Sequence, residues 1–106
     1  MNYRFMRLIL FFDLPVESTA EKRSYRKFVK TLKVNGFYML QKSVYVKLNI
    51  DMKSSDGTIK KIEKDLPPKG NISVLVVTEK QFAAMEFLLG ENKTDVVNTD
   101  ERVTII

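Results

Sequence analysis

The segment covering residues 5–13 limits the possible folds more than any other part of this chain. Successive residues of an extended strand point to opposite faces, and both of the resulting sets are mostly apolar here. One set is Met6, Leu8, Leu10 and Phe12, and the other is Phe5, Arg7, Ile9, Phe11 and Asp13. A strand with two apolar faces has to be covered on both sides, or nearly so, and the pattern therefore predicts a central strand of a sheet. Pro15 ends this strand, because proline has no N–H for the ladder.

The next segment has the signals of a long helix. Ser18 and Glu21 form a capping-box pattern, in which the serine hydroxyl accepts from the Glu21 amide and the Glu21 side chain reaches back. Four apolar residues then recur at the spacing of one helix face: Tyr25, Phe28, Val29 and Leu32. Gly36 is suited to follow a helix C-terminus, and the prediction is a helix over about residues 19–35.

Residues 37–48 alternate as a β segment, but at 12 residues they exceed the usual strand length of about 5 to 6 residues. The polar triplet Gln41, Lys42 and Ser43 fits either a bulge in one long strand or a tight reversal between two strands. With no glycine to mark a turn, both arrangements remain open. Ser43 is interpreted as a turn hydroxyl rather than a nucleophile, because the chain has no histidine to act as its base.

The following segments continue the alternation of helix and strand. Residues 49–57 are mostly polar and are interpreted as a loop, after which a second, shorter helix ends before Pro67. Its apolar residues at helical spacing are Ile59, Ile62 and Leu66. Residues 72–77 contain four β-branched aliphatic side chains and are predicted to form a buried strand.

Residues 82–89 fit a helix and a strand alike, and a short strand signal closes the chain at residues 101–106. The order strand, helix, strand or hairpin, helix, strand indicates the α+β class and a ferredoxin-like βαββαβ sandwich with additional C-terminal strands. At 106 residues and 12.3 kDa, the chain has room for one such domain, over residues 1–106.

The chain contains no cysteine, histidine or tryptophan. This composition excludes disulfides, Cys/His zinc sites, and catalysis by Cys/His or Ser/His/Asp systems. Carboxylates, hydroxyls, Lys and Arg side chains and a hard metal ion remain. The apolar run at residues 5–12 is shorter than the about 20 residues that span a bilayer, and Arg7 interrupts it. We therefore expect a cytoplasmic protein without a membrane partner.

The net charge of +5 is unevenly distributed. Residues 1–53 hold 11 Lys/Arg and 4 Asp/Glu, whereas residues 54–106 hold 7 and 9. Six cations lie on the first predicted helix: Lys22, Arg23, Arg26, Lys27, Lys30 and Lys33. A basic helix suits contacts with nucleic-acid phosphates that do not read the base sequence. The alternative is a solvated lysine-rich face with no such partner.

Asp13 is the one carboxylate placed at the carboxyl end of a buried strand, next to the cationic helix. This makes it the candidate catalytic residue and magnesium ligand. In the alternative interpretation, it caps the turn at Pro15 or pairs with Arg7 or a lysine. Because Mg²⁺ takes about six oxygen ligands, a single carboxylate is not enough for hydrolysis. A symmetric homodimer would supply a second Asp13.

Several stretches of the chain resemble the CRISPR-associated protein two family, the small dimeric partner of the CRISPR spacer integrase. They are MRLILFFDLP at residues 6–15, Asn35-Gly36-Phe37 after the helix, and QKSVY at residues 41–45. Residues 70–82 and the sequence FLLG at residues 87–90 resemble the version found in CRISPR systems with a single large effector nuclease. The likeness extends over essentially the whole chain.

The resemblance implies a ferredoxin-like homodimer in which each Asp13 faces its mate and the pair holds Mg²⁺. It also implies metal-dependent endonuclease activity on RNA or double-stranded DNA. In the CRISPR adaptation complex, which acquires new spacers, the dimer would be a non-catalytic bridge that holds two integrase dimers apart and lays the spacer DNA across its basic surface. The family pattern also favours a strand within residues 82–89.

The resemblance assigns a docking role to the tail strand at residues 100–106. This strand would dock on the partner protomer and the integrase. Its docking residues would be Arg102, Val103, Thr104, Ile105 and Ile106.

A ferredoxin-like regulatory or small-molecule-binding domain with no role at nucleic acids is the remaining alternative. Such modules normally have a glycine-rich turn at the ligand, whereas the four glycines here stand singly at apparent element boundaries. They are Gly36, Gly57, Gly70 and Gly90. The glycine pattern therefore disfavours this alternative.

Overall fold

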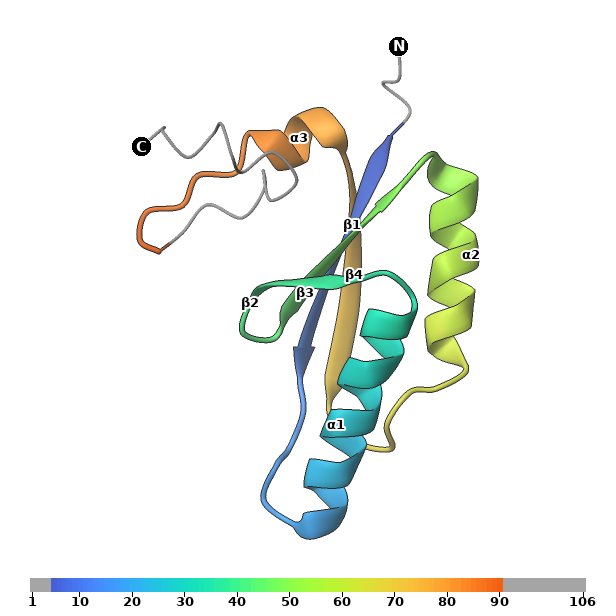
Figure 1. Ribbon diagram of the computed structural model, residues 1–106, viewed down its shortest axis with the longest axis vertical. Helices are drawn as coiled ribbons and strands as arrows, with labels where there is room; N and C mark the ends of the chain where they lie inside the picture. The colour runs from blue at the N-terminus through green and yellow to red at the C-terminus, as the bar shows by residue number, and fades with distance from the viewer. Residues whose placement is uncertain (1–4, 91–106) are drawn as a thin grey trace.

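The computed structural model describes residues 5–90 of the chain. The elements, in chain order, are β1 (Met6–Asp13), α1 (Thr19–Val34), β2 (Tyr38–Gln41), β3 (Val44–Asn49), α2 (Met52–Glu63), β4 (Asn71–Thr78) and α3 (Glu79–Ala83). This is the predicted βαββαβ order followed by one short helix, and it confirms the α+β ferredoxin-like fold (Figure 1). The expected tail strand at residues 100–106 lies outside the described residues. No helix in the described part of the chain is long and apolar enough to cross a membrane.

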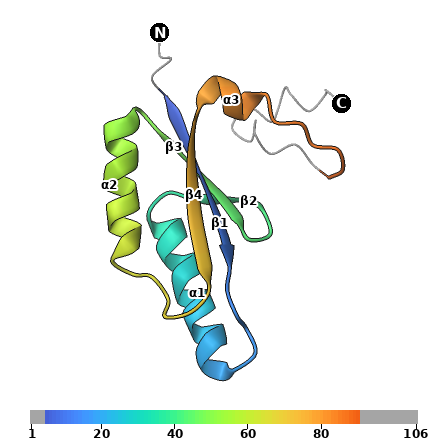
Figure 2. The same cartoon turned by 180° about the vertical axis from the view of Figure 1, so that it is seen from behind.

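β1 occupies a central position in the sheet, as its two apolar faces predict. The four strands are in the order β2-β3-β1-β4, and β1 pairs antiparallel with both β3 and β4. Ile9, for example, lies opposite Val46 on one side and Leu75 on the other. Helices α1 and α2 both lie against one face of this sheet (Figures 1 and 2). The opposite face is called the open face below.

The main hydrophobic core lies between the sheet and these two helices. Its buried members come from β1 and the following residue, from α1 and the α1–β2 connection, from β3 and from α2: Leu8, Leu10, Phe12, Leu14, Phe28, Leu32, Phe37, Tyr45 and Ile62. The Phe12 ring meets Tyr25 and Phe28 edge to face, with centroids 5.7 and 5.6 Å away. Burial of each large apolar side chain contributes about 1.5–3 kcal/mol, so this layer is the principal source of stability.

The boundaries of α1 agree with the sequence pattern. The Ser18 hydroxyl accepts from the Glu21 amide at 3.0 Å, and Glu21 accepts in return from the Ser18 amide at 3.0 Å. At the other end, Asn35 is the C-cap, and Gly36 follows with a φ of 90°. This left-handed conformation is one that glycine adopts without steric cost.

Residues 37–48 form a hairpin rather than one long strand. β2 and β3 pair antiparallel, with a register shift between Met39 and Gln41, so the reversal and the bulge that the sequence left open are both present. Ser43 has a φ of 66°, and its carbonyl accepts from the Phe12 amide at 3.1 Å. The turn is therefore tied to the end of β1.

The predicted loop over residues 49–57 is wrong, because α2 already begins at Met52. The Asp51 side chain caps this helix by accepting from the Ser54 amide at 2.8 Å. The first turns bury polar residues: the hydroxyls of Ser55 and Thr58 donate to backbone carbonyls one turn earlier. Hydrophobic spacing did not reveal a helix face whose buried residues are hydroxylic.

Two further predictions, for Gly57 and Leu66, are wrong because the bounds of α2 differ from those expected. Gly57 lies inside the helix and not at an element boundary. Leu66, which was expected on the apolar face, lies beyond the helix end at Glu63 and is 49% exposed. Pro67 is preceded by a short turn segment, so the helix ends before the proline restricts it.

A strand within residues 82–89, favoured by the family pattern, is also wrong. Thr78 and Gln81 form a capping box that starts α3, and residues 84–90 contain no strand. Phe82 is buried on the open face with Ile9 and Val46. The local cap and this anchor hold the segment as a helical turn.

Arg7 fixes α3 to the open face through a buried cluster. Its guanidinium donates to both carboxylate oxygens of Glu79, at 2.6 and 2.9 Å, and to the Tyr38 hydroxyl at 3.0 Å. It also lies 4.5 Å from the centre of the Phe82 ring. Burial disfavours the charged guanidinium, but Glu79 and Tyr38 outweigh that effect and raise the pKa of Arg7. Arg7 therefore connects β1, β2 and α3.

This cluster predicts strong coupling between Arg7 and Glu79. Replacing Arg7 by Ala leaves Glu79 and Tyr38 without their partner, and we expect the free energy of unfolding to fall by about 2 kcal/mol. In a double-mutant cycle with Glu79→Ala, measured by urea unfolding, the coupling should be about 1 kcal/mol or more. Lys80→Ala, a change at an exposed neighbour, is the control and should have little effect. Additive effects of Arg7→Ala and Glu79→Ala would contradict the cluster's role.

Gly70 holds the end of β1 in place and gives a second prediction. Its φ is +112°, and a Cβ there would lie 2.8 Å from the Asp13 carbonyl oxygen and 2.5 Å from Leu14 Cδ2. Gly70→Ala should therefore lower the free energy of unfolding by about 2 kcal/mol or more, measured by urea unfolding. Gly57→Ala is the matched control, because nothing lies within 4 Å of its added Cβ. The control should match the parent or be more stable by up to about 1 kcal/mol. Equal stability of Gly70→Ala and the parent would disprove this constraint.

Candidate functional site

Asp13 is an exposed carboxylate on a rigid backbone. It is the last residue of β1, where it lies opposite Asn71 of β4, and both of its chain neighbours, Phe12 and Leu14, are buried. The Phe12 amide is bonded to the hairpin turn, and Gly70 packs against the Asp13 carbonyl. The strand end is thus fixed while the side chain faces outward.

The alternative that Asp13 pairs with Arg7 is wrong. The two residues share the open face but lie six positions apart, which corresponds to about 20 Å along a strand. Arg7 instead binds Glu79. Within residues 5–90, the Asp13 side chain has no hydrogen bond or ion pair to another residue. Its two oxygens are therefore available to a ligand.

One chain provides only part of a metal site. Among the described residues, no group of three or more Asp, Glu, His or Cys side chains comes together where it could hold a metal ion. A carboxylate is the right donor for Mg²⁺, which accepts one or two protein carboxylates and completes its shell with water. A magnesium site at Asp13 would therefore need ligands beyond the described side chains, from water or from a second carboxylate.

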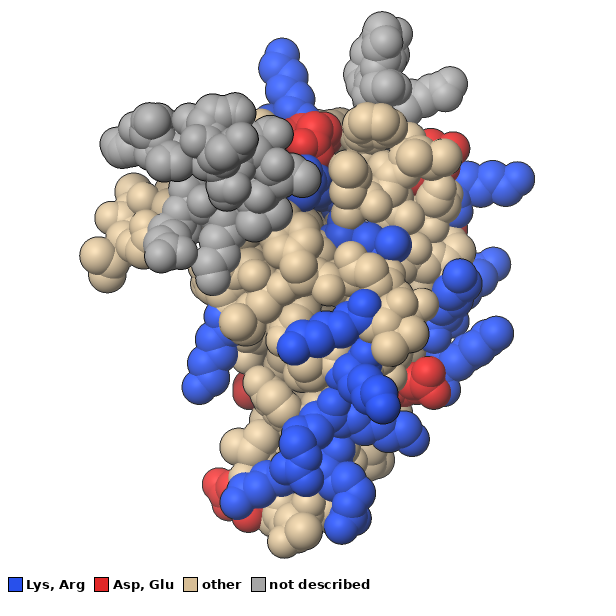
Figure 3. Space-filling model, in the orientation of Figure 1, with Lys and Arg blue, Asp and Glu red and all other residues tan. Residues whose placement is uncertain are grey.

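The basic residues of α1 gather on one exposed surface, as predicted. All six cations from Lys22 to Lys33 are exposed. Figure 3 shows Lys and Arg side chains concentrated over the face that carries α1 and α2. We call this surface the basic face.

Sequence reasoning missed a second part of the basic face. Four exposed lysines from α2 and the α2–β4 connection extend it: Lys60, Lys61, Lys64 and Lys69. The net charge of residues 54–106 is negative, and this total concealed the four lysines. Their clustering within ten positions, against only two acids in that interval, was the signal that could have revealed them.

The structure separates Asp13 from the basic face. The helices that carry the cations cover one side of the sheet, whereas Asp13 belongs to the alternating set of β1 that points to the open face. Sequence proximity between Asp13 and α1 had suggested one site. The two features instead form two surfaces, which can act independently.

The open face around Asp13 retains uncovered apolar surface. α3 and the residues after it cover the part near Ile9 and Val46. Phe11, Leu48 and Leu75, which share this face by register, remain 40%, 45% and 52% exposed. Among the described strands, β4 pairs only with β1, so its outer edge is unpaired. Both features are typical of a surface that contacts another chain.

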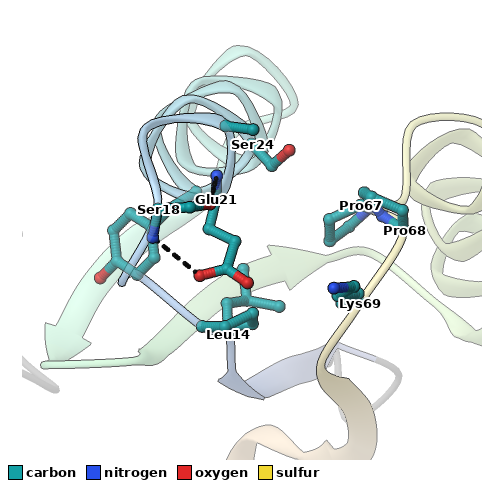
Figure 4. Close-up of a pocket in the computed structure, with 10 residues that line it drawn as sticks. Leu14, Ser18, Glu21, Ser24, Pro67, Pro68 and Lys69 are labelled. Atoms are coloured by element: carbon teal, nitrogen blue, oxygen red, sulfur yellow. Dashed lines mark hydrogen bonds between the residues drawn. The ribbon is translucent and has the colours of Figure 1, made fainter.

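A small pocket of about 160 Å³ lies between the start of α1 and the α2–β4 connection (Figure 4). Leu14 and Tyr25 line it on one side, and Pro67 and Pro68 line it on the other. Its one carboxylate, Glu21, accepts from the backbone N–H groups of Ser18 and Glu17, which hold the pKa of Glu21 below its usual value. The carboxylate is thus engaged in capping, and the volume is below the about 300 Å³ typical of ligand pockets.

Comparison with known proteins identifies the family. Residues 6–85 match the family model described as CRISPR associated protein Cas2. A protein of Treponema denticola named CRISPR-associated endoribonuclease Cas2 is 50% identical over 95% of this chain and 100% of its own length.

Two further relatives carry the same name. The Ligilactobacillus salivarius protein is 48% identical over 95% of this chain and all of its own length. One from Streptococcus mutans is 45% identical over 95% of this chain and 93% of its own. With a four-stranded ferredoxin-like sheet and this degree of identity, the chain belongs to the CRISPR-associated Cas2 family.

Proposed function

We propose that this chain is the homodimeric bridging subunit of the CRISPR adaptation complex, where it binds spacer DNA without sequence specificity and connects two integrase dimers. The observation that carries this proposal is the separation of the basic face from Asp13. A DNA path over α1 and α2 leaves the open face available for a second copy of the chain. One small domain can then bind DNA and a protein partner simultaneously.

The open face supports the homodimer. Phe11 and Leu75 are exposed apolar residues close to the centre of this face, where pairing with a second copy would bury them. Such burial contributes about 25 cal/mol per Å² of apolar surface. A twofold axis near the Asp13 end of β1 would also bring the two Asp13 carboxylates together, because a symmetric contact places the same residues opposite each other.

The basic face supports sequence-neutral binding of double-stranded DNA. Its residues are lysines and arginines on helix surfaces, which neutralise phosphates from outside the grooves. This contact fixes the position of the DNA and leaves its bases unread. A subunit that accepts spacers of any sequence requires that property.

The relatives' name supports a second, catalytic role as an endoribonuclease. We extend this role to a magnesium-dependent activity on RNA or double-stranded DNA, because Asp13 offers a carboxylate of the kind that binds Mg²⁺. The Asp13 side chains of two protomers would hold Mg²⁺, which supplies an activated water and charge stabilisation at the phosphate. Among residues 5–90, no side chain competes for the Asp13 carboxylate, which is fixed at a strand end. Because the basic face is on the other side of the sheet, DNA bridging would not need this activity.

Docking on the integrase is assigned to the tail strand at residues 100–106. Its residues Arg102 to Ile106 lie outside the described part of the chain. The unpaired outer edge of β4 in the partner protomer is one of the two edges of the described sheet that suit an added strand.

Charge reversal on α1 tests the DNA-binding role. Arg26→Glu combined with Lys30→Glu should weaken duplex binding at least about tenfold and reduce the magnitude of the slope of log K against log salt by about 2. Adding Arg23→Glu and Lys27→Glu should abolish spacer integration with the cognate integrase.

The control must carry the same change in net charge. Lys42→Glu combined with Lys80→Glu alters two exposed lysines outside the basic face and should leave affinity and integration close to the parent. Fluorescence anisotropy across a salt series and an integration assay provide the measurements. Equal losses in both double variants would show that net charge, and not the basic face, governs binding.

Substitution of Asp13 tests the catalytic role separately. Asp13→Asn removes a metal-binding charge from an exposed position, so cleavage of RNA and duplex DNA in Mg²⁺ should fall by about 100-fold or more. Spacer integration should continue, because the basic face is unchanged. Asp56→Asn, at an exposed site on α2, is the matched control for cleavage. Cleavage by the Asp13→Asn protein at the parent's rate would exclude Asp13 as the metal ligand.

A further inference from the structure

A polar groove of about 540 Å³ lies at the other end of the sheet from Asp13. It is bounded by the end of α1, the second half of β3 and one side of α2. Its lining residues are Val34, Asn35, Gly36, Lys47, Asn49, Ser54, Gly57, Thr58 and Lys61. The volume is within the range of about 300–1,000 Å³ that holds small-molecule ligands.

Asn49 supplies an unsatisfied acceptor at this groove. The residue is only 8% exposed, and its side-chain oxygen Oδ1 is buried without a hydrogen-bond partner. Buried polar atoms in proteins are nearly always paired, because leaving one unpaired is unfavourable. An unpaired amide oxygen therefore indicates a missing donor.

The orientation of the Asn49 amide follows from its neighbour. The Thr58 hydroxyl donates its single proton to the Ser54 carbonyl at 3.1 Å. Its oxygen can then only accept from Asn49, and it does so from Nδ2 at 3.3 Å. The atom left without a partner is thus the acceptor Oδ1, and a ligand that satisfies it must present an N–H or O–H group.

The charged residues of the groove select an anion. Lys47 and Lys61 both line it, and the lining includes no acidic residue. Lys47 crosses the end of α1: its Nζ occupies the position 2.6 Å from where a Gly36 Cβ would be. A helix C-terminus favours a cation at this position. Two ammonium groups match a phosphate monoester, which carries nearly two negative charges at neutral pH.

Gly57 has no structural reason to be glycine. It lies in the interior of α2, where alanine is the better helix former, and its φ is not positive. An added Cβ would have nothing within 4 Å. The missing side chain instead leaves the α2 wall of the groove bare and gives a ligand access to the helix backbone.

We propose that this groove binds a nucleotide through its phosphate monoester, either as a free mononucleotide or as the phosphorylated end of a strand. Lys47 and Lys61 take the phosphate, and a small shift of the Asn49 side chain on binding lets its buried Oδ1 accept from a sugar hydroxyl or a base amino group. The groove is on the helix side of the sheet, apart from Asp13, and does not depend on the metal. It shares Lys61 with the basic face, but it differs from the rest of that face in requiring a strand end or a free nucleotide.

Calorimetric titration of the full chain tests this proposal with AMP, adenosine and inorganic phosphate. AMP should bind at least about tenfold more tightly than either fragment, because it uses the lysines and the Asn49 acceptor together. A 5′-phosphorylated tetranucleotide and its 5′-hydroxyl form test whether the ligand is the end of a strand or a free mononucleotide. Preference for the phosphorylated tetranucleotide over AMP identifies a strand end, and the reverse identifies a free nucleotide. Equal binding of AMP and inorganic phosphate would overturn the proposal.

Three variants locate the binding. Lys61→Ala should weaken AMP binding about tenfold, whereas Lys80→Ala, at an exposed lysine outside both the groove and the basic face, should leave it unchanged. Gly57→Ala should keep or raise the melting temperature and still weaken AMP binding, which separates an effect on the ligand from an effect on folding. Equal losses in Lys80→Ala and Lys61→Ala, or unchanged binding in both Lys61→Ala and Gly57→Ala, would show that AMP does not bind in the groove.

Discussion

The burial of β1 on both of its faces is the constraint on which the rest of this structure depends. Leu8, Leu10 and Phe12 form the floor of the main core beneath α1 and α2, while Ile9 and Arg7 hold α3 on the open face. Two of the three ladders of the described sheet also use this strand. Asp13 is fixed in space because it ends a strand that can hardly move. The hydrophobic core that holds β1 therefore also fixes the position of the candidate catalytic residue Asp13.

The elements that the sequence predicted correctly are those with a local signal, either a periodic apolar pattern or a helix cap. The two-faced pattern of β1 and the capping box of α1 are of this kind, and the structure confirms both. The start of α2 was missed because Ser55 and Thr58 are buried by means of hydrogen bonds to the preceding turn, which hydropathy does not register. The hairpin at Ser43 depends on a left-handed residue that is not glycine, so no composition signal marked it.

The candidate site shows the same division between local and assembled features. Asp13 and the cations of α1 were identified from their positions in the sequence, and the structure places all of them at the surface. Their separation onto two faces was not predictable, because it depends on which side of the sheet α1 packs against. The groove at Asn49 was also out of reach, since it combines the end of one helix, a strand and a second helix. The atom that points to a ligand there is Asn49 Oδ1, and its lack of a hydrogen-bond donor can be recognised only from the three-dimensional structure.

The antiparallel pairing of β1 with β4 has a consequence for synthesis on the ribosome. Met6 pairs with Thr78, so the first strand to emerge can complete its second ladder only after nearly all of the described chain has been made. Until then, one edge of this apolar strand has no ladder partner. Arg7 lies within this strand as its only charged residue before Asp13. During translation, this arginine would act as a gatekeeper against association between nascent chains, before it becomes the anchor for α3.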